Sequence, residues 1–186
     1  MIITITGKPC SGKGTVAKEF CKTYNFEYIC TGDMFREHAK KLGYDNILTF
    51  KEEDQRVKQV DMVVYNSIQE LGKTKLEQDI VIDSRLAWHF IPNSFKVFID
   101  VDKTIAGERL IEANRDTERT SSLADAIKKL ENRWKVENDR YSELYQTNNL
   151  NPKNYDLVID SSHLTPKQIM KKIYLAYNKF INSKKN

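Results

Sequence analysis

The sequence has no apolar run long enough to cross a membrane, since a spanning helix needs about 20 predominantly apolar residues. Cysteine is scarce: Cys10, Cys21 and Cys30 have neither C-x-x-C spacing nor a plausible set of metal-binding neighbours. An odd, scattered count is typical of reduced thiols in a cytoplasm. The first apolar stretch is short and leads directly into a glycine-containing loop, so we expect no signal peptide. These absences predict a cytoplasmic protein without a membrane partner.

Several catalytic and regulatory motifs are also missing. The chain lacks the guanine-reading N-K-x-D motif and a D-x-x-G switch, which argues against a regulatory GTPase. His38, His89 and His163 show no metal-ligand spacing, and no G-x-S-x-G or Cys–His pattern is present. The sequence therefore gives no sign of a hydrolytic triad or of a histidine metal site.

Glycine and proline are sparse, at 7 and 4 residues, and no Gly/Ser-rich or Pro-rich linker divides the chain. No internal repeat is found either. Since 186 residues suffice for one good core, we expect a single domain over residues 1–186. The net charge of +4 suits anionic small molecules as well as nucleic acid, so it does not decide between them.

Short, β-branched apolar runs alternate with stretches of helical spacing. The runs lack an apolar–polar alternation, which is typical of strands covered on both faces. We expect strands at residues 2–6, 28–30, 80–83, 96–101 and 155–160, and helices at residues 16–24, 57–71, 105–111, 126–145 and 169–180. Thr165 and Pro166 should open the last helix as its cap and first residue. This order predicts a parallel α/β sheet whose ligand lies beyond the carboxyl ends of the strands.

Residues 7–15 read G-K-P-C-S-G-K-G-T, between the first predicted strand and the first predicted helix. Glycines let such a loop curl so that backbone N–H groups converge on a phosphate at the positive end of the helix. Lys13 would reach the β- and γ-phosphates, and Thr15 would supply a hydroxyl to Mg²⁺. A plain glycine-rich turn is the alternative, but the flanking elements favour a nucleoside-triphosphate site. The expected ATP contacts are Gly7, Pro9, Cys10, Ser11, Gly12, Lys13, Gly14, Thr15 and Val16.

Three charged residues are expected at the carboxyl ends of strands. Asp83 closes the apolar run 80–82, where it could hold the Mg²⁺ shell beside the loop or simply cap the next turn. Arg36 and Arg85 each follow a predicted strand end. Guanidinium groups at such positions can stabilise the charge that develops on a transferring phosphoryl group.

Arg133 and Arg140 lie seven residues apart, and therefore on one face of a predicted helix. Glu137 lies between them on the same face. From spacing alone, an exposed Arg–Glu–Arg ladder and a phosphate clamp explain this pattern equally well.

Five segments resemble, in this order, the motifs of nucleoside monophosphate kinases, and among them the short cytidylate kinases of the archaeal type. They are G-K-G-T at residues 12–15, T-G-D-M-F-R at 31–36, D-S-R-L-A-W at 83–88, the helix segment from Arg133 to Arg140-Tyr141, and Y-D-L-V-I-D at 155–160. The resemblance covers nearly the whole chain. Many ATPases share the first motif, whereas the ordered set is specific.

The resemblance implies a P-loop protein of three layers, α/β/α, with a five-stranded parallel sheet, a monophosphate-binding flap at about residues 33–72 and a short lid at about 114–122. It implies ATP and Mg²⁺ as cofactors, and a monomer whose partners are small-molecule nucleotides rather than nucleic acid. The implied monophosphate contacts are Thr31, Gly32, Asp33, Arg36, Arg85 and Arg140, with Asp61 in the flap. The implied catalytic groups are Lys13, Arg85, Arg133 and Arg140, while Arg109 would lie near the donor nucleotide. Thr15 and Asp83 would hold the metal.

Some positions depart from the family pattern. Leu86 stands where the longer bacterial cytidylate kinases have an aspartate that reads the cytosine ring, and Cys10 replaces a common Gly or Ala. Asp54 and Asp61 in the flap could read an exocyclic amine or the ribose, or could lie on the helix surface. Arg115 and Arg119 fall in the lid, where the alignment is loose.

The expected reaction is transfer of the γ-phosphoryl group of ATP to CMP or dCMP. An adenylate kinase, or another small-molecule kinase on the same scaffold, is an alternative, although the lid is short and lacks zinc-binding cysteines. A nucleotide-gated binding or assembly factor is a third hypothesis. Such a factor would have no use for Arg36, Arg85 and Arg140 around a second phosphate.

Overall fold

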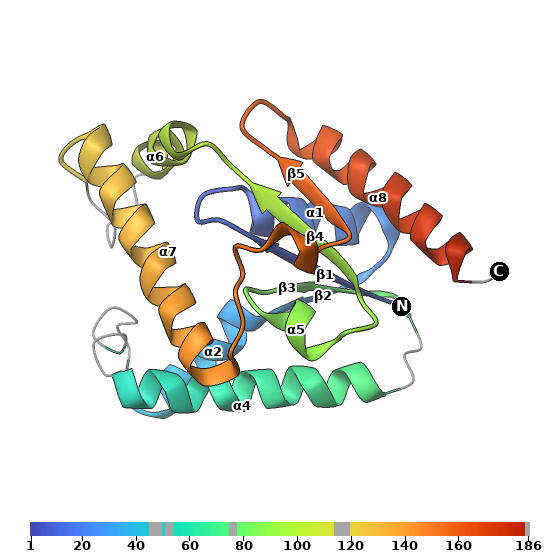
Figure 1. The fold of residues 1–186 in the computed structure, drawn as a ribbon, viewed down its shortest axis with the longest axis horizontal. Helices are drawn as coiled ribbons and strands as arrows, with labels where there is room; N and C mark the ends of the chain where they lie inside the picture. Colours follow the sequence, from blue (N-terminus) through green and yellow to red (C-terminus); the bar gives the residue numbers. More distant parts are fainter. Residues whose placement is uncertain (45–49, 51–53, 75–77, 114–119, 185–186) are drawn as a thin grey trace.

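A computed structural model describes residues 1–44, 50, 54–74, 78–113 and 120–184. Five strands form one parallel sheet in the order β2-β3-β1-β4-β5 (Figure 1). Their bounds are β1 Ile2–Gly7, β2 Glu27–Cys30, β3 Ile80–Asp83, β4 Phe95–Asp100 and β5 Leu157–Asp160. All five predicted strands are confirmed, although β5 begins two residues later than expected and β4 starts and ends one residue earlier.

The helices connect these strands and include two that the sequence did not predict. Their bounds are α1 Lys13–Tyr24, α2 Thr31–Lys41, α4 Asp54–Lys73, α5 Ala87–Phe90, α6 Lys103–Glu112, α7 Leu123–Tyr145 and α8 Pro166–Ser183, and a short 3₁₀ turn, η2, spans Pro152–Asn154. Helix α2 was missed because few of its residues are apolar and only Thr31 and Ala39 are buried. Helix α5 is too short to show a period.

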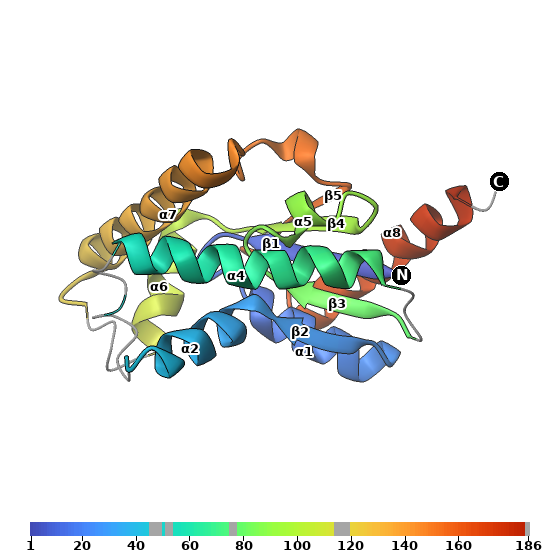
Figure 2. The same ribbon diagram turned by 90° about the horizontal axis from the view of Figure 1, so that it is seen from below.

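The sheet is covered on both faces, as its apolar strands predict. On one face, Ile3, Ile5 and Val97 pack against α1 and α8, which contribute Phe20 and Ile173 (Figure 2). On the other face, Ile2, Ile80 and Ile82 pack against α4 and α5 through Ile68, Ala87 and Ile91. Alternate strand residues thus enter two separate cores. The three-layer α/β/α prediction is confirmed.

Side-chain caps mark the starts of α6 and α8. Asp102 accepts a hydrogen bond from the Thr104 N–H at 2.7 Å at the start of α6. Thr165 and Gln168 form a capping box at the start of α8, with Pro166 in the first turn, as the sequence predicts. None of the helices in the described part of the chain is long and apolar enough to cross a membrane.

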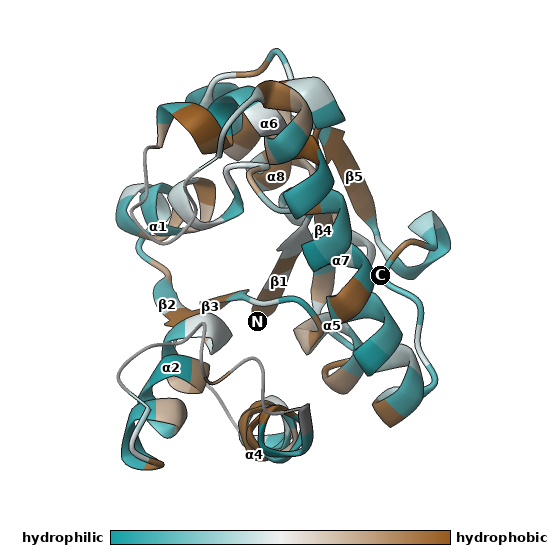
Figure 3. Cartoon of the chain, turned by 90° about the vertical axis from the view of Figure 1, so that its left-hand side faces the viewer, coloured by the Kyte–Doolittle hydropathy of each residue, from teal (hydrophilic) through white to brown (hydrophobic). Residues whose placement is uncertain are grey.

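The strands all end at the same edge of the sheet, because they are parallel. In the β1–β3 register Ile5 lies opposite Asp83, and in the β1–β4 register Gly7 lies opposite Ile99. Helices α2, α4, α6 and α7 surround this edge (Figure 3). Most of the predicted lid, including Arg115 and Arg119, falls outside the described residues, as do parts of the predicted flap and the side chain of Asp54.

Candidate active site

The loop between β1 and α1 has the curled backbone that its sequence predicts. A Cβ on Gly7 would lie 2.4 Å from the Ile99 carbonyl oxygen, so only glycine lets the loop leave the sheet beside β4. Gly12, with φ of 79°, and Cys10, with φ of 58°, are left-handed. Gly12 is the N-cap of α1 and has no side chain that could accept the first N–H groups of the helix. The loop therefore leaves the positive end of α1 available to an anion.

A cavity of about 460 Å³ lies over this loop. Residues of the loop and basic side chains of α1, α6, α7 and the segment after β3 line this cavity. The lining residues are Lys8, Pro9, Cys10, Ser11, Gly12, Lys13, Gly14, Thr15, Lys18, Arg85, Arg109, Leu110, Ala113 and Arg133. Three of the predicted arginines thus meet the predicted loop in one space. Neither Arg36 nor Arg140 is among the described residues that line it.

Lys13 and Asp83 form a buried ion pair under the cavity, with side chains 17% and 5% exposed. The Tyr28 hydroxyl donates to the other carboxylate oxygen of Asp83 at 3.1 Å. Burial lowers the pKa of Lys13 below the ordinary lysine value, against the attraction of Asp83. Burial and the neighbouring Asp83 carboxylate raise the pKa of Tyr28, which keeps it a neutral donor. Lys13 is thus held at the start of α1 by a carboxylate from β3.

The donor set beside the loop fits Mg²⁺. Asp83 Oδ2 lies so close over Gly14 that a Cβ there would be 3.2 Å from it, and the exposed Thr15 lines the cavity. One carboxylate and one hydroxyl are few ligands, but Mg²⁺ in nucleotide sites takes its remaining oxygens from phosphates and water. The described residues contain no group of three or more acidic, histidine or cysteine side chains that could cage a metal. The metal role of Thr15 and Asp83 stays a prediction.

Arg85 connects three parts of the site. Its guanidinium donates to the Gly7 carbonyl, lies 3.0 Å through Nε from Glu137 Oε2, and stands 5.3 Å from the centre of the Trp134 ring. Arg133, from the same helix as Glu137, contacts Glu137 Oε1 at 3.4 Å. Since Glu137 is only 14% exposed, one buried carboxylate on α7 holds two cavity arginines together.

The structure shows one ion pair of the Arg–Glu–Arg ladder on α7, whereas the phosphate clamp stays a prediction. Arg133 does pair with Glu137, as in a ladder, and it also lines the cavity. Arg140 does not extend the ladder, because its ion pair is with Asp61 of α4. Glu137 itself was not predicted as a site residue. Its spacing of four and three residues from the two arginines was the signal that could have identified it.

Arg109 joins the loop to the end of β5. It donates to the Cys10 carbonyl at 3.2 Å and to the Ser161 carbonyl at 2.8 Å. Ser161 in turn donates to the Ser11 carbonyl at 3.0 Å. Arg109, which belongs to α6, lines the cavity, and its place beside a donor nucleotide stays a prediction. No sequence motif predicted the contribution of Ser161.

The segment after β2 becomes the first turns of α2. Thr31 is buried and its hydroxyl lies 3.4 Å from the Asp83 carbonyl, so it ties α2 to β3. Asp33 and Arg36 are exposed and paired with each other one turn apart. The hydrogen bond from Arg36 lowers the pKa of Asp33. The proposed contacts of Gly32, Asp33 and Arg36 with a monophosphate stay predictions.

Asp61 is buried rather than on the helix surface. Its side chain is 4% exposed, and its Oδ2 accepts a hydrogen bond from Arg140 Nε at 2.6 Å. Arg140 is 15% exposed and also lies against the ring of Tyr141. Asp61 therefore engages an arginine of the predicted site from a buried position, and the helix-surface alternative for Asp61 is wrong.

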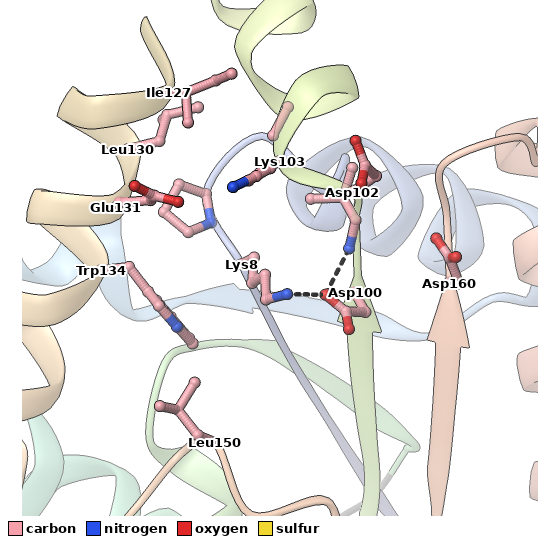
Figure 4. Close-up of a pocket in the computed structure, with 13 residues that line it drawn as sticks. Lys8, Asp100, Asp102, Lys103, Ile127, Leu130, Glu131, Trp134, Leu150 and Asp160 are labelled. Carbon is pink, nitrogen blue, oxygen red and sulfur yellow. Dashed lines mark hydrogen bonds and ion pairs between the residues drawn. The ribbon is translucent and has the colours of Figure 1, made fainter. Parts of the chain in front are cut away.

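A second cavity, of about 530 Å³, lies on the other side of the loop (Figure 4). Lys8 pairs there with Asp100 Oδ1 at 2.6 Å, which anchors the start of the loop to the end of β4. Apolar side chains of α7, including Leu130 and Trp134, form the opposite wall. No sequence pattern predicted this cavity, because its residues come from five separate segments.

One predicted ATP contact needs correction. The side chain of Val16 is 1% exposed and belongs to the core between the sheet and α1, because it lies on the inner face of the helix. Its N–H already donates to the Gly12 carbonyl at 3.0 Å. Val16 supports the loop from below and cannot offer its side chain to a nucleotide.

Comparison with known sequences gives the family. The sequence profile of the Cytidylate kinase-like family matches residues 2–163. A cytidylate kinase of Methanocaldococcus jannaschii is 34% identical over 164 residues, which are 87% of this chain and 89% of that protein. The S-adenosylmethionine-dependent nucleotide dehydratase of Lacinutrix mariniflava is 35% identical over 95% of this chain. The match is only 36% of that protein, so the chain spans little more than a third of that relative's length.

Solved structures give the fold. A shikimate kinase from Bacteroides thetaiotaomicron superposes with a TM-score of 0.66 at 12% identity, covering 96% of this chain and 98% of that one. An uncharacterized protein from Eubacterium ventriosum superposes with a TM-score of 0.70 at 20% identity, covering 98% and 99%. These likenesses agree with a kinase fold. By its sequence match, its five-stranded parallel sheet and its phosphate-type loop, the chain belongs to the cytidylate kinase-like family.

Proposed function

We propose that this protein transfers the γ-phosphoryl group of ATP to a pyrimidine nucleoside monophosphate, CMP or dCMP. One observation carries the proposal: Lys13, Arg85, Arg109 and Arg133 line a single cavity over the positive end of α1. A cavity with four converging cations suits the phosphates of a donor and an acceptor better than those of a donor alone.

The reaction needs little covalent help from the protein. A phosphate oxygen of the acceptor attacks the γ-phosphorus of ATP, and the bond from that phosphorus to the β,γ-bridging oxygen breaks. The products are a nucleoside diphosphate and ADP, which keeps the electron pair of the broken bond. The attacking oxygen is already anionic, so no general base is required. Alignment and stabilisation of charge are what the site must supply.

Each cavity residue has a role in this scheme. The N–H groups of the loop and Lys13 hold the β- and γ-phosphates, and Arg85 and Arg133 stabilise the charge on the transferring group. Glu137 keeps these two arginines at the cavity wall. Thr15 and Asp83 would hold Mg²⁺, which neutralises phosphate charge when bound. Arg109 holds the loop against the end of β5, beside the donor.

The identity of the base rests on family membership. Leu86 is completely buried in a cluster with Trp88, Tyr65 and Tyr141, so it fills the core and cannot read a base edge. A cytosine reader must therefore come from another position than in the longer bacterial enzymes. The archaeal cytidylate kinases that match most of this chain support CMP as the acceptor.

The decisive experiment offers CMP, dCMP, UMP, AMP and GMP separately with ATP and Mg²⁺ in a coupled assay of ADP release. We expect CMP or dCMP to give the highest kcat/KM. Preference for AMP would favour the adenylate kinase alternative. If no monophosphate raises the rate above the ATPase background, the protein is a nucleotide-gated binding factor rather than a monophosphate kinase.

A second candidate function concerns the use of the product. A relative that matches nearly all of this chain with 36% of its own length bears the name of an S-adenosylmethionine-dependent nucleotide dehydratase. That arrangement supports a kinase that supplies phosphorylated nucleotide to a dehydratase. Adding the purified kinase, ATP and CMP to such a dehydratase, together with the S-adenosylmethionine on which its name says it depends, should yield dehydrated nucleotide, whereas the same mixture without the kinase should not.

The cellular setting is proposed on the same basis. We propose one monomeric catalytic domain that acts on free nucleotides in the cytoplasm, and not on nucleic acid. Light scattering of the purified chain, with and without ATP and CMP, tests the oligomeric state. A mass near 21.7 kDa is expected in both cases.

A further inference from the structure

A polar seam joins α4 to α7 beside the cavity. Two ion pairs cross it: Asp61 Oδ2 to Arg140 Nε at 2.6 Å, and Lys58 Nζ to Glu143 Oε1 at 2.7 Å. Both pairs lie near the C-terminal end of α7, where α7 descends onto α4 and crosses it in Figure 1. The two pairs differ in setting, since Asp61 is 4% exposed and Glu143 is 62% exposed.

The geometry of the Asp61–Arg140 pair, the inner of the two, shows which part of the guanidinium remains able to bind a ligand. Asp61 meets the guanidinium at Nε, on the side of the fork nearest the chain. The end of the fork that bears the two Nη groups is the part that suits bidentate binding of a phosphate. The Tyr65 hydroxyl lies 3.5 Å from the Tyr141 hydroxyl, and the Tyr141 ring lies against the guanidinium. The arginine is thus held from its Nε side and from one face.

The surroundings of Asp61 argue against direct contact with a base. Its carboxylate is buried and already engaged by a fixed cation, so a base amine would have to displace Arg140. A buried carboxylate that loses its cation is strongly disfavoured, which opposes such an exchange. A role in holding Arg140, by contrast, keeps the ion pair that Asp61 already makes.

We infer that Asp61 is a positioning residue, which orients Arg140 from α4 so that its Nη groups meet the phosphate of the acceptor nucleotide. The inference rests on the proposed function and deepens it. It assigns Asp61 no contact with the base or the ribose. It also means that acceptor binding depends on the seating of α4 against α7, two elements that lie far apart in the sequence.

The test measures the dissociation constant of CMP and of UMP by calorimetry, and kcat and KM for the coupled reaction, in D61A, D61N, R140M and D61A/R140M. D61A should raise the Kd of both nucleotides by the same factor, about tenfold or more, since a charged hydrogen bond that orients the phosphate ligand is lost. D61N keeps an oxygen acceptor for Nε and should recover part of this loss. R140M should cost much less in the D61A background than in the wild type, because the two residues act as one unit.

E143Q is the matched control, since it breaks the outer pair between the same two helices. It should change Kd by less than about twofold, as expected for an ion pair whose carboxylate is exposed. An equal loss in E143Q would mean that Asp61 serves only helix docking, and would overturn the inference. A changed ratio of CMP to UMP affinity in D61A or D61N would overturn it as well, because Asp61 would then read the base.

Two further readouts distinguish a failure of the inference from a failure to fold and from a failure of the proposed function. Circular dichroism melting identifies a variant that fails to fold. If D61A fails to fold, D61N and R140M carry the test. Unchanged Kd values in folded D61N and D61A overturn the inference alone. Wild-type protein that binds CMP but transfers no phosphoryl group overturns the proposed function and leaves the binding test of Asp61 in force. Wild-type protein that binds no monophosphate overturns both.

Discussion

The two sides of the candidate site are built in different ways. The loop side comes from one continuous segment, in which Gly7, Gly12 and the first turn of α1 create the anion site with backbone groups. The proposed acceptor side, at α4, α7 and the segment after β3, consists of charged side chains that come from distant segments. There the pairs Asp61–Arg140 and Arg85–Glu137 hold the guanidinium groups.

This difference has a physical consequence. A backbone site is fixed by local conformation, so it is encoded by a few glycines and survives changes in its surroundings. A site of paired side chains depends on how helices pack, and the loss of one partner leaves a buried charge alone. The loop side should therefore respond to changes in backbone freedom, and the acceptor side to changes in charge.

The largest expected effect is on the loop side. Lys13→Ala should lower kcat by about a thousandfold or more, because the cation beside the transferring phosphoryl group is lost while the backbone N–H groups of the loop remain. Steady-state ADP release with CMP measures this, and circular dichroism checks the fold. A variant that keeps near-normal turnover would refute the assigned role of the loop.

The arginine network is the next strongest point. Arg85→Ala should lower kcat/KM by about a hundredfold, and Glu137→Gln by about tenfold, since the second variant keeps the arginines but not their anchor. Measuring both with the same acceptor ranks a contact residue against its support. A larger loss in Glu137→Gln than in Arg85→Ala would reverse these roles.

The pH profile gives a smaller effect on the loop side. Burial lowers the pKa of Lys13 below the ordinary lysine value of 10.5. The protonated lysine is the active form, so the rate is full below the lowered pKa and is lost as pH rises through it. We expect kcat/KM, which reports the free enzyme, to decline at an alkaline pH below 10.5. A flat profile up to that pH, with the fold intact, would contradict this state of Lys13.

The smallest expected effect is on stability, and it tests whether the loop depends on its backbone conformation. Gly12→Ala should lower the free energy of unfolding by about 1–2 kcal/mol, because φ is 79° and no atom within 4 Å explains a loss by crowding. Gly32→Ala is the matched control, since Gly32 lies in the first turn of α2 and its nearest atoms are 3.6 Å away. That control should be neutral or stabilising by up to about 1 kcal/mol. Urea denaturation measures both, and equal losses would contradict the backbone account.

The same division explains what the sequence could predict. The strands and the loop follow from short-range patterns, namely apolar runs and the spacing of Gly7, Gly12 and Lys13, and they were predicted close to their observed bounds. Helix α2 escaped prediction because few of its residues are apolar and only two of them are buried. The partners of Arg140 and Arg85 could not be predicted, because Asp61 lies 79 residues from Arg140 in the chain and only tertiary packing joins them. Only that packing shows whether Asp61 lies on the helix surface or is buried against another helix.

The most direct test of the central claim follows phosphorus through the reaction. Wild-type protein is incubated with ATP, Mg²⁺ and CMP, and the products are identified by ³¹P NMR. If two nucleotides meet in the arginine-lined cavity, the diphosphate signals of CDP and ADP should grow together in equal amounts, with little inorganic phosphate. ADP and inorganic phosphate without CDP would show that the acceptor never reaches the γ-phosphoryl group, and would contradict the account.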